Sequence, residues 1–340
     1  MEDKFYYPVE RVISKVTEDL KKYPSADIYK IISSGKLNNE IKRIDIAGRI
    51  TNVAEVIAYN NPDTLEMEYS VVLSMAYCQY LWSICDIALR TLDHLIYVSE
   101  AAKSGLNLEE FIRSNDELIN KTDAELIEFI KNYDYDIDPN KLRLQTERIN
   151  ELLKDNRFHE KMGNELAIAF SLLPNEGLPL RHNAFRQLDM SDGYGLVANS
   201  CCLKGVSFIL LHELNHVALD HFSHSPTIQD EKEADSSAFW TMYVDSDENE
   251  KFTVGIGIIC TLFSLFIKDF ESEVDGVHPR EDIRLFETLD NMINDNEKYG
   301  YMVIYLFNLW ASIKRISDFP EVQITDPDDI NKIKEYFSRI

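Results

Sequence analysis

The sequence predicts a mostly α-helical protein with a small β-sheet, an α+β fold. Apolar residues recur at helical spacing along most of the 340 residues, whereas a single pair of β-prone runs occurs, on either side of the turn sequence "NNPD". A hydrophobic content of 45% and a charged content of 28% are typical of a globular chain. A chain of this length can bury a large core, as one domain or as two smaller ones.

The N-terminal part is expected to contain short helices, then a hairpin and a long helix. In residues 1–50, "VERVISKVTEDLKKY" has apolar residues at helical spacing. The β-prone runs Asn52–Asn60 and Thr64–Val71 flank strong turn chemistry and predict a β-hairpin. The apolar stretch that follows predicts a long helix closed by Gly105. Residues 51–105 are therefore expected to form a hairpin and a helix that pack on the core.

The next region, residues 106–164, is charged and is predicted to be helical. Its segment "TDAELIEFIKNY" begins with a threonine cap and an acidic first turn. This region is a candidate regulatory insert, although a solvated helical face would explain the same charges. Residues 165–340 are expected to form the core of the fold and the C-terminal helices, with the loop "LLPNEGLPLRHNAFRQLDMSDGYGL" before the histidine-rich segment described below.

Charge and cysteine content exclude several classes of protein. A net charge of -24 argues against binding to nucleic acid or to an anionic membrane, because phosphate contacts need clustered Lys and Arg. Five cysteines without a CxxC pair indicate reduced thiols.

The sequence shows neither a signal peptide nor a clear membrane span. The N-terminus lacks signal-peptide features. The longest apolar run, Phe252–Ile267, is too short to span a bilayer comfortably and predicts a buried helix. We therefore expect a cytoplasmic protein.

The sequence "HELNH" matches the HExxH pattern of zinc hydrolases. His212 and His216 are four residues apart, which projects both rings from one face of a helix. Imidazole suits Zn²⁺, and a catalytic zinc site typically has three protein ligands. Glu213 is placed to act as a general base toward water. Two core histidines beside a solvated glutamate would give the same pattern, so a third ligand decides between the two interpretations.

The other nearby histidines are poor candidates for the third ligand. On a continued helix His221 would point about 180° away from His212. His224 lies beyond the expected end of the helix. The metzincin pattern also fails, because it requires a histidine where this chain has Phe222.

Carboxylates at the start of the following helix are better candidates. Asp230, Glu231, Glu233 and Asp235 lie within "TIQDEKEADSSAFW". Glu231 and Asp235 are four apart and share a helix face, whereas Glu233 points elsewhere. We expect Glu231 to be the third metal ligand and Asp235 to accept the free N–H of a ligating histidine. An acidic first turn favoured by the helix dipole is the alternative explanation.

Three ordered blocks carry a family resemblance. "HELNH", "EKEAD" and "VHPREDIRLFE" resemble the HExxH, ExxxD and HPxxxxR elements of gluzincin zinc peptidases, with His278 and Arg284 in the third block. The longer matches "HELNHVALDH" and "EKEADSSA" look like the Lit-type phage-exclusion peptidases of bacteria, over about residues 200–290. The resemblance implies a minimal gluzincin-like core with an active-site HExxH helix, an edge hairpin and added helices.

The resemblance also implies roles for individual residues. It implies that zinc is bound by His212, His216 and Glu231, that Glu213 is the catalytic base and that Asp235 supports a ligand. His278 would lie near the cleft, where it either polarises the substrate carbonyl or serves as a cap or packing residue.

The function that the resemblance implies is cleavage of elongation factor Tu to abort phage infection. Such an enzyme must be restrained until a phage-derived activator peptide or protein binds it. An edge strand of the predicted hairpin could hold the substrate in an extended form. Two alternatives remain open: a zinc peptidase of a repressor or toxin–antitoxin circuit, and a non-catalytic, zinc-stabilised regulatory protein that binds a partner.

Overall fold

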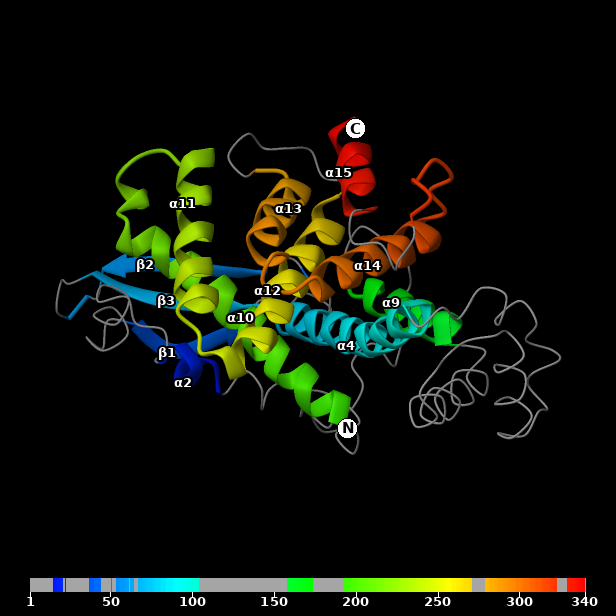
Figure 1. Ribbon diagram of the computed structural model, residues 1–340. Coiled ribbons are helices and arrows are strands. Elements are labelled where there is room, and N and C mark those ends of the chain that lie inside the picture. The colour runs from blue at the N-terminus through cyan, green and yellow to red at the C-terminus, as the bar shows by residue number, and fades with distance from the viewer. Residues whose placement is uncertain are drawn as a thin grey trace, which may run out of the picture.

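The computed structural model describes residues 15–20, 22, 37–43, 50, 53–60, 62–63, 67–103, 158–173, 193–270, 279–322 and 329–339. These residues are mostly helical with one small sheet (Figure 1), so the predicted α+β class is confirmed. The helices expected over residues 106–157, the loop of residues 174–192 and His278 lie outside the described residues. The proposed division into domains stays a prediction.

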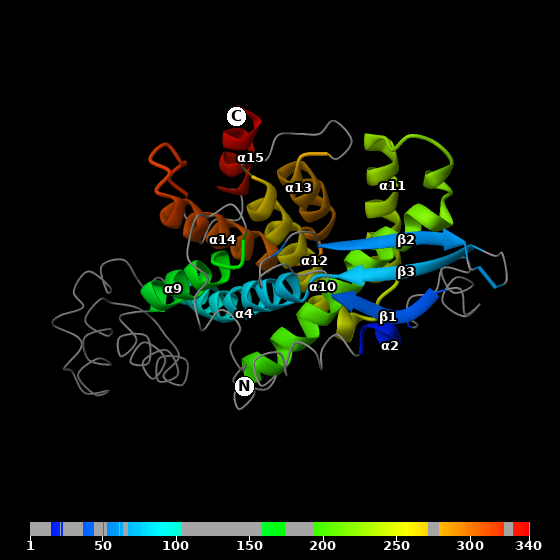
Figure 2. The ribbon, with the colours of Figure 1, turned by 180° about the vertical axis from the view of Figure 1, so that it is seen from behind.

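The described strands form one three-stranded sheet with the order β1-β3-β2. β2 (Ala54–Asn60) and β3 (Met67–Leu73) are antiparallel, as the predicted hairpin requires. The hairpin is therefore confirmed, with β3 in the centre and β2 at an edge. Figure 2 shows β2 on the side of α11 (Ile228–Phe239).

The N-terminal region differs from the expected run of short helices. α2 (Val16–Leu20) is a helix, but β1 (Leu37–Arg43) is a strand that pairs in parallel with β3. The expectation of helices alone was wrong for β1. Its sequence, LNNEIKR, has no alternating apolar pattern, and strand formation depends on the partner strand that it meets in the fold.

Three long helices form the centre of the protein. α4 (Met75–Lys103), α10 (Gly193–Ala218) and α12 (Glu248–Asp269) pack against one another. α4 confirms the long helix predicted after the hairpin. α10 and α12 cross very closely at Gly257. A Cβ added there would lie only 2.5 Å from the carbonyl oxygen of Cys201. This crossing embeds the HExxH helix in the core.

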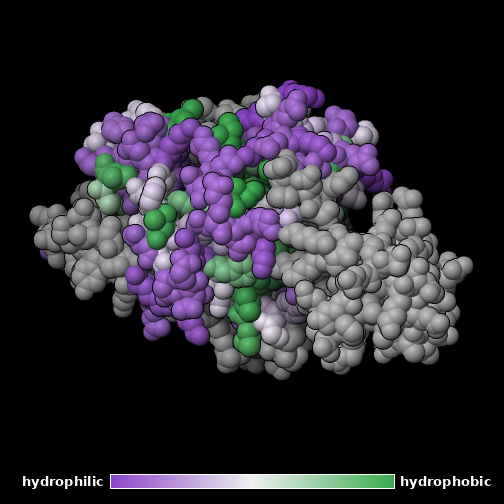
Figure 3. Space-filling model, viewed as in Figure 1, coloured by the Kyte–Doolittle hydropathy of each residue, from purple (hydrophilic) through white to green (hydrophobic). Residues whose placement is uncertain are grey.

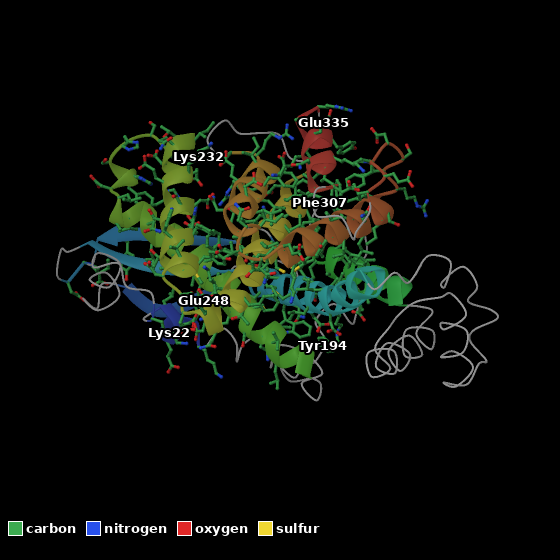
Figure 4. All side chains as sticks on the ribbon, viewed as in Figure 1. Lys22, Tyr194, Lys232, Glu248, Phe307 and Glu335 are labelled. Carbon is green, nitrogen blue, oxygen red and sulfur yellow. The ribbon has the colours of Figure 1, made fainter. Side chains whose placement is uncertain are left out.

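Shorter helices surround this centre: α9 (Phe158–Phe170), α11, the π-helical turn η2 (Trp240–Val244), α13 (Glu281–Met292), α14 (Lys298–Lys314) and α15 (Ile330–Ser338). An aromatic cluster joins the C-terminal helices to α12. Phe307 of α14, labelled in Figure 4, lies with its ring centroid 5.1 Å from that of Phe266 and 5.2 Å from that of Phe337. These rings pack α14 and α15 against α12.

α10 and α12 are long and apolar enough to cross a membrane when judged by length and composition. Most of each span is buried within the protein, however, and the core helices of soluble proteins meet the same criterion. The buried helix predicted at Phe252–Ile267 is part of α12, where the buried residues include Val254 and Ile267. On the face of the protein seen in Figure 1, the coloured surface of Figure 3 is mainly hydrophilic, with separate small apolar patches.

All five cysteines are buried and none forms a disulfide, as expected for core thiols. Burial raises the pKa of the Cys85 and Cys201 thiols well above the usual value, which keeps them protonated. These cysteines are therefore packing residues.

Candidate metal centre

The C-terminal part of α10 carries two histidines that face each other. His212 and His216 are one helical turn apart, and their Nε2 atoms are separated by 3.1 Å. The His212 side chain is 9% exposed and the His216 side chain 13%, so both rings lie mostly out of water. The predicted shared face of the HExxH pair is confirmed.

The third member of the group comes from α11. Thr227 and Asp230 form a capping box, in which each side chain accepts a hydrogen bond from the other residue's backbone N–H. This start of the helix places Glu231 in the first turn, where it is buried. Its carboxylate lies 3.3 Å from Nε2 of His212 and 3.4 Å from Nε2 of His216. Glu231 is thus the carboxylate that faces both histidines.

The spacing of these side chains fits a tetrahedral zinc site. Ligand atoms of His212, His216 and Glu231 all lie within 4.8 Å of one another, the one such group among the described residues. Zinc bonds of about 2.0–2.1 Å at tetrahedral angles put neighbouring ligand atoms about 3.3 Å apart. The two Nε2 atoms, 3.1 Å apart, are close to that value, and Glu231 approaches His212 with one oxygen at 3.3 Å and His216 with the other at 3.4 Å. The group could therefore hold a metal ion.

The electrostatics of the site also favour a bound cation. Burial lowers the pKa of His212, but the adjacent Asp235 and Glu231 outweigh it and raise that pKa to about 10. Burial and the charge of His212 lower the pKa of His216 to about 4. The two rings together therefore favour one positive charge, and a divalent cation would replace that proton.

A carboxylate and an arginine support His212 from the side opposite Glu231. Oδ1 of Asp235 lies 2.9 Å from Nδ1 of His212, so the carboxylate is beside the ring nitrogen that faces away from the candidate metal site. Arg284 of α13 donates two hydrogen bonds to Asp235, of 2.6 and 2.7 Å, and also donates to Glu281. Burial raises the pKa of Asp235, but Arg284 and His212 outweigh it and keep that pKa well below its usual range.

The contact between Arg284 and Asp235 was missed at the level of sequence. The HPxxxxR block contained the signal, since Arg284 is its last residue, but the block alone does not say which carboxylate it meets. The structure shows that the ExxxD and HPxxxxR blocks meet through this pair.

The two predicted catalytic residues stand differently. Glu213 follows His212 on α10 and has a half-buried side chain, whereas His278 lies outside the described residues.

His221 lies beside His216, contrary to the prediction that it points away. The prediction assumed a continuous helix, but α10 ends at Ala218 and Asp220 takes a left-handed conformation, with φ of 60°. The chain reverses there and brings Nδ1 of His221 to 2.9 Å from Nδ1 of His216. His221 is not part of the metal-ligand group, and neither is His224, which is half exposed beyond the turn.

Comparisons with known proteins support one family. The model of the family described as Peptidase U49, the Lit peptidase family, matches residues 71–305. The comparisons with curated proteins and with solved structures found no match. The matched segment runs from β3 into α14 and includes both α10 and α11. Because it covers more than half of the chain, we conclude that the chain belongs to the Peptidase U49 family of peptidases.

Proposed function

We propose that this protein is a zinc-dependent endopeptidase of the gluzincin type. The observation that carries the proposal is the convergence of His212, His216 and Glu231, whose ligand atoms lie within 4.8 Å of one another. Membership of a peptidase family supports hydrolysis of peptide bonds as the reaction. When bound, zinc supplies Lewis-acid chemistry that makes a water molecule more acidic and polarises the scissile carbonyl.

Glu213 is the proposed general base. It lies next to His212 on α10, and its half-buried side chain can face water from within the helix that carries both histidines. Its carboxylate would take a proton from the attacking water and pass it to the nitrogen of the leaving amine. Asp235 and Arg284 would fix the orientation of the His212 ring during these transfers. His278 is proposed to polarise the substrate carbonyl or to act as a cap or packing residue.

The edge strand β2 is the proposed binding site for the substrate backbone. β2 packs against α10, and its outer side has no strand partner among the described residues. Ile57 on this strand is 40% exposed and could contact a substrate side chain. An extended peptide could add to β2 through main-chain hydrogen bonds.

The proposed biological role is that of a Lit-like phage-exclusion peptidase in the cytoplasm. Family membership supports this role. By the same resemblance we propose elongation factor Tu as the substrate and a phage-derived peptide or protein as the activator. The net charge of -24 favours protein partners over nucleic acid or anionic membranes.

The central test is the substitution Glu213→Gln, which removes the base and keeps the shape of the side chain. Cells expressing the wild-type chain should contain newly cut proteins that cells expressing Glu213→Gln lack, while both purified proteins still bind zinc. Cleavage sites would be identified by proteomics of new N-termini. Glu248→Gln is the matched control, since Glu248 is 90% exposed at the start of α12, and it should cut like the wild type.

The same experiment separates the alternatives. Equal cleavage by wild type and Glu213→Gln would reject the proposed mechanism. If wild type cuts a repressor or antitoxin and Glu213→Gln does not, the proposed mechanism stands and the proposed biological role is replaced. A variant that keeps its cellular function while no cut is detected with either protein would favour a zinc-stabilised regulatory protein.

A further inference from the structure

The turn after α10 places a buried histidine against one of the two ligand histidines. Asp220 reverses the chain, and His221 begins the short helix η1 (His221–Ser223). The His221 side chain is 6% exposed, and its Nδ1 lies 2.9 Å from Nδ1 of His216. The Nε2 atom of His216 points the other way, toward His212 and Glu231.

This geometry fixes which nitrogen of each ring carries a proton. A metal ligand must be unprotonated at the coordinating atom, so a neutral His216 that binds through Nε2 carries its proton on Nδ1. Within the described part of the chain, the atom that this N–H faces is Nδ1 of His221, at 2.9 Å, and that nitrogen must be unprotonated to accept the hydrogen bond. A neutral His221 therefore carries its own proton on Nε2.

The structure also offers acceptors for that second proton. Nε2 of His221 is buried and makes no hydrogen bond within the described residues, and it faces Glu233 at 3.6 Å and Asp230 at 3.8 Å. The Asp230 carboxylate is held in place because its other oxygen accepts hydrogen bonds from the backbone and hydroxyl of Thr227. Carboxylates at the start of α11 thus face the nitrogen of His221 that would carry this proton.

We propose that His221 is the positioning residue of His216, which it orients for metal binding by accepting the hydrogen bond of its Nδ1–H. This inference rests on the proposed zinc site and adds the counterpart to Asp235. Beside His212 lies a carboxylate that an arginine holds, whereas beside His216 lies an imidazole whose far nitrogen faces carboxylates. Groups in such positions typically change metal affinity 10–100-fold when removed.

The test is zinc affinity, measured on the purified full chain by competition with a chromophoric chelator. His221→Ala should weaken zinc binding roughly 10–100-fold. His221→Asn should recover most of that loss, because the asparagine oxygen can accept a hydrogen bond close to where Nδ1 of histidine does. His224→Ala is the matched control. His224 approaches the same oxygen of Asp230, at 3.7 Å, but is half exposed and outside the ligand group, so it should bind like the wild type.

A spectroscopic readout separates positioning from general packing. The visible bands of bound Co²⁺ depend on ligand geometry, so they should change in His221→Ala and return toward the wild-type spectrum in His221→Asn. Wild-type affinity and spectrum in His221→Ala would overturn the inference. Equal losses in both variants would overturn it too, since an acceptor at this position would then not matter. If the wild-type chain binds no zinc, the proposed function fails with it.

Discussion

The two histidines of the candidate site have different supporting partners. Asp235 beside His212 is anionic and is fixed by the buried Arg284, whereas the partner of His216 is the imidazole of His221. A carboxylate partner makes an imidazole a stronger donor to a metal than a neutral partner does. We therefore expect His212 to contribute more to zinc affinity than His216.

Asp235→Asn tests the carboxylate directly. The substitution keeps the size of the side chain but removes the charge that faces both His212 and Arg284. Zinc affinity should fall roughly 10–100-fold, and the melting temperature should drop because the charge of Arg284 loses its closest partner. Chelator competition and thermal unfolding would measure the two effects. Asp245→Asn, at an exposed position after η2, should change neither.

The grouping of the candidate ligands could be predicted because much of its geometry is local. The spacing of His212 and His216 depends only on the helix that contains both residues, and the positions of Glu231 and Asp235 depend only on the next helix. The position of His221 could not be predicted in the same way. It depends on where α10 stops. The chain reverses at Asp220 in a left-handed conformation, which most residues other than glycine avoid, so the sequence contains no clear signal for it.

At the level of elements, the close crossing of α10 and α12 determines where the HExxH helix lies. The hairpin was predictable because its turn sequence is strong, but β1 was not, since its partner strand lies elsewhere in the chain. The crossing was not predictable either. Nothing in the sequence shows that Gly205 and Gly257 face each other, whereas the structure brings their backbones into contact.

Gly257→Ala tests this crossing. Alanine normally stabilises a helix relative to glycine by up to about 1 kcal/mol, but here its Cβ would lie 2.5 Å from the backbone oxygen of Cys201. Overpacking of this kind should lower the free energy of unfolding by roughly 1–3 kcal/mol. The control is Gly163→Ala on α9, whose Cβ would meet only Leu309, at 3.7 Å, and which should be neutral or stabilising. Urea unfolding of both variants would measure the difference, and equal stabilities would contradict the tight crossing.

At the scale of the whole molecule, a buried ion pair joins α2, near the N-terminus, to the helix that carries HExxH. Lys204 of α10 donates to Asp19 of α2 at 2.9 Å and to Glu250 of α12 at 3.0 Å, and Ser207 donates to the other oxygen of Asp19. Figure 4 shows Lys22 and Glu248 near this junction of α2 and α12. Residues far apart in sequence meet here, so the pair was outside the reach of local patterns.

Asp19→Ala should destabilise the whole fold. The Asp19 side chain is 2% exposed, and its removal leaves the buried ammonium of Lys204 beside the partly exposed carboxylate of Glu250. Removing one member of a buried pair costs roughly 3–5 kcal/mol, and the contact with Glu250 should keep the loss near the lower value. The free energy of unfolding in urea is the measurement.

Lys22→Ala is the matched control for this pair. Lys22 also lies 3.3 Å from Asp19, but its side chain is 56% exposed, so solvent screens the contact and its removal should cost less than about 1 kcal/mol. A large loss in Asp19→Ala with a small loss in Lys22→Ala would show that burial, and not charge count, makes α2 part of the core. Similar small losses in both variants would instead mean that α2 contributes little to the stability of the helix that carries the candidate metal centre.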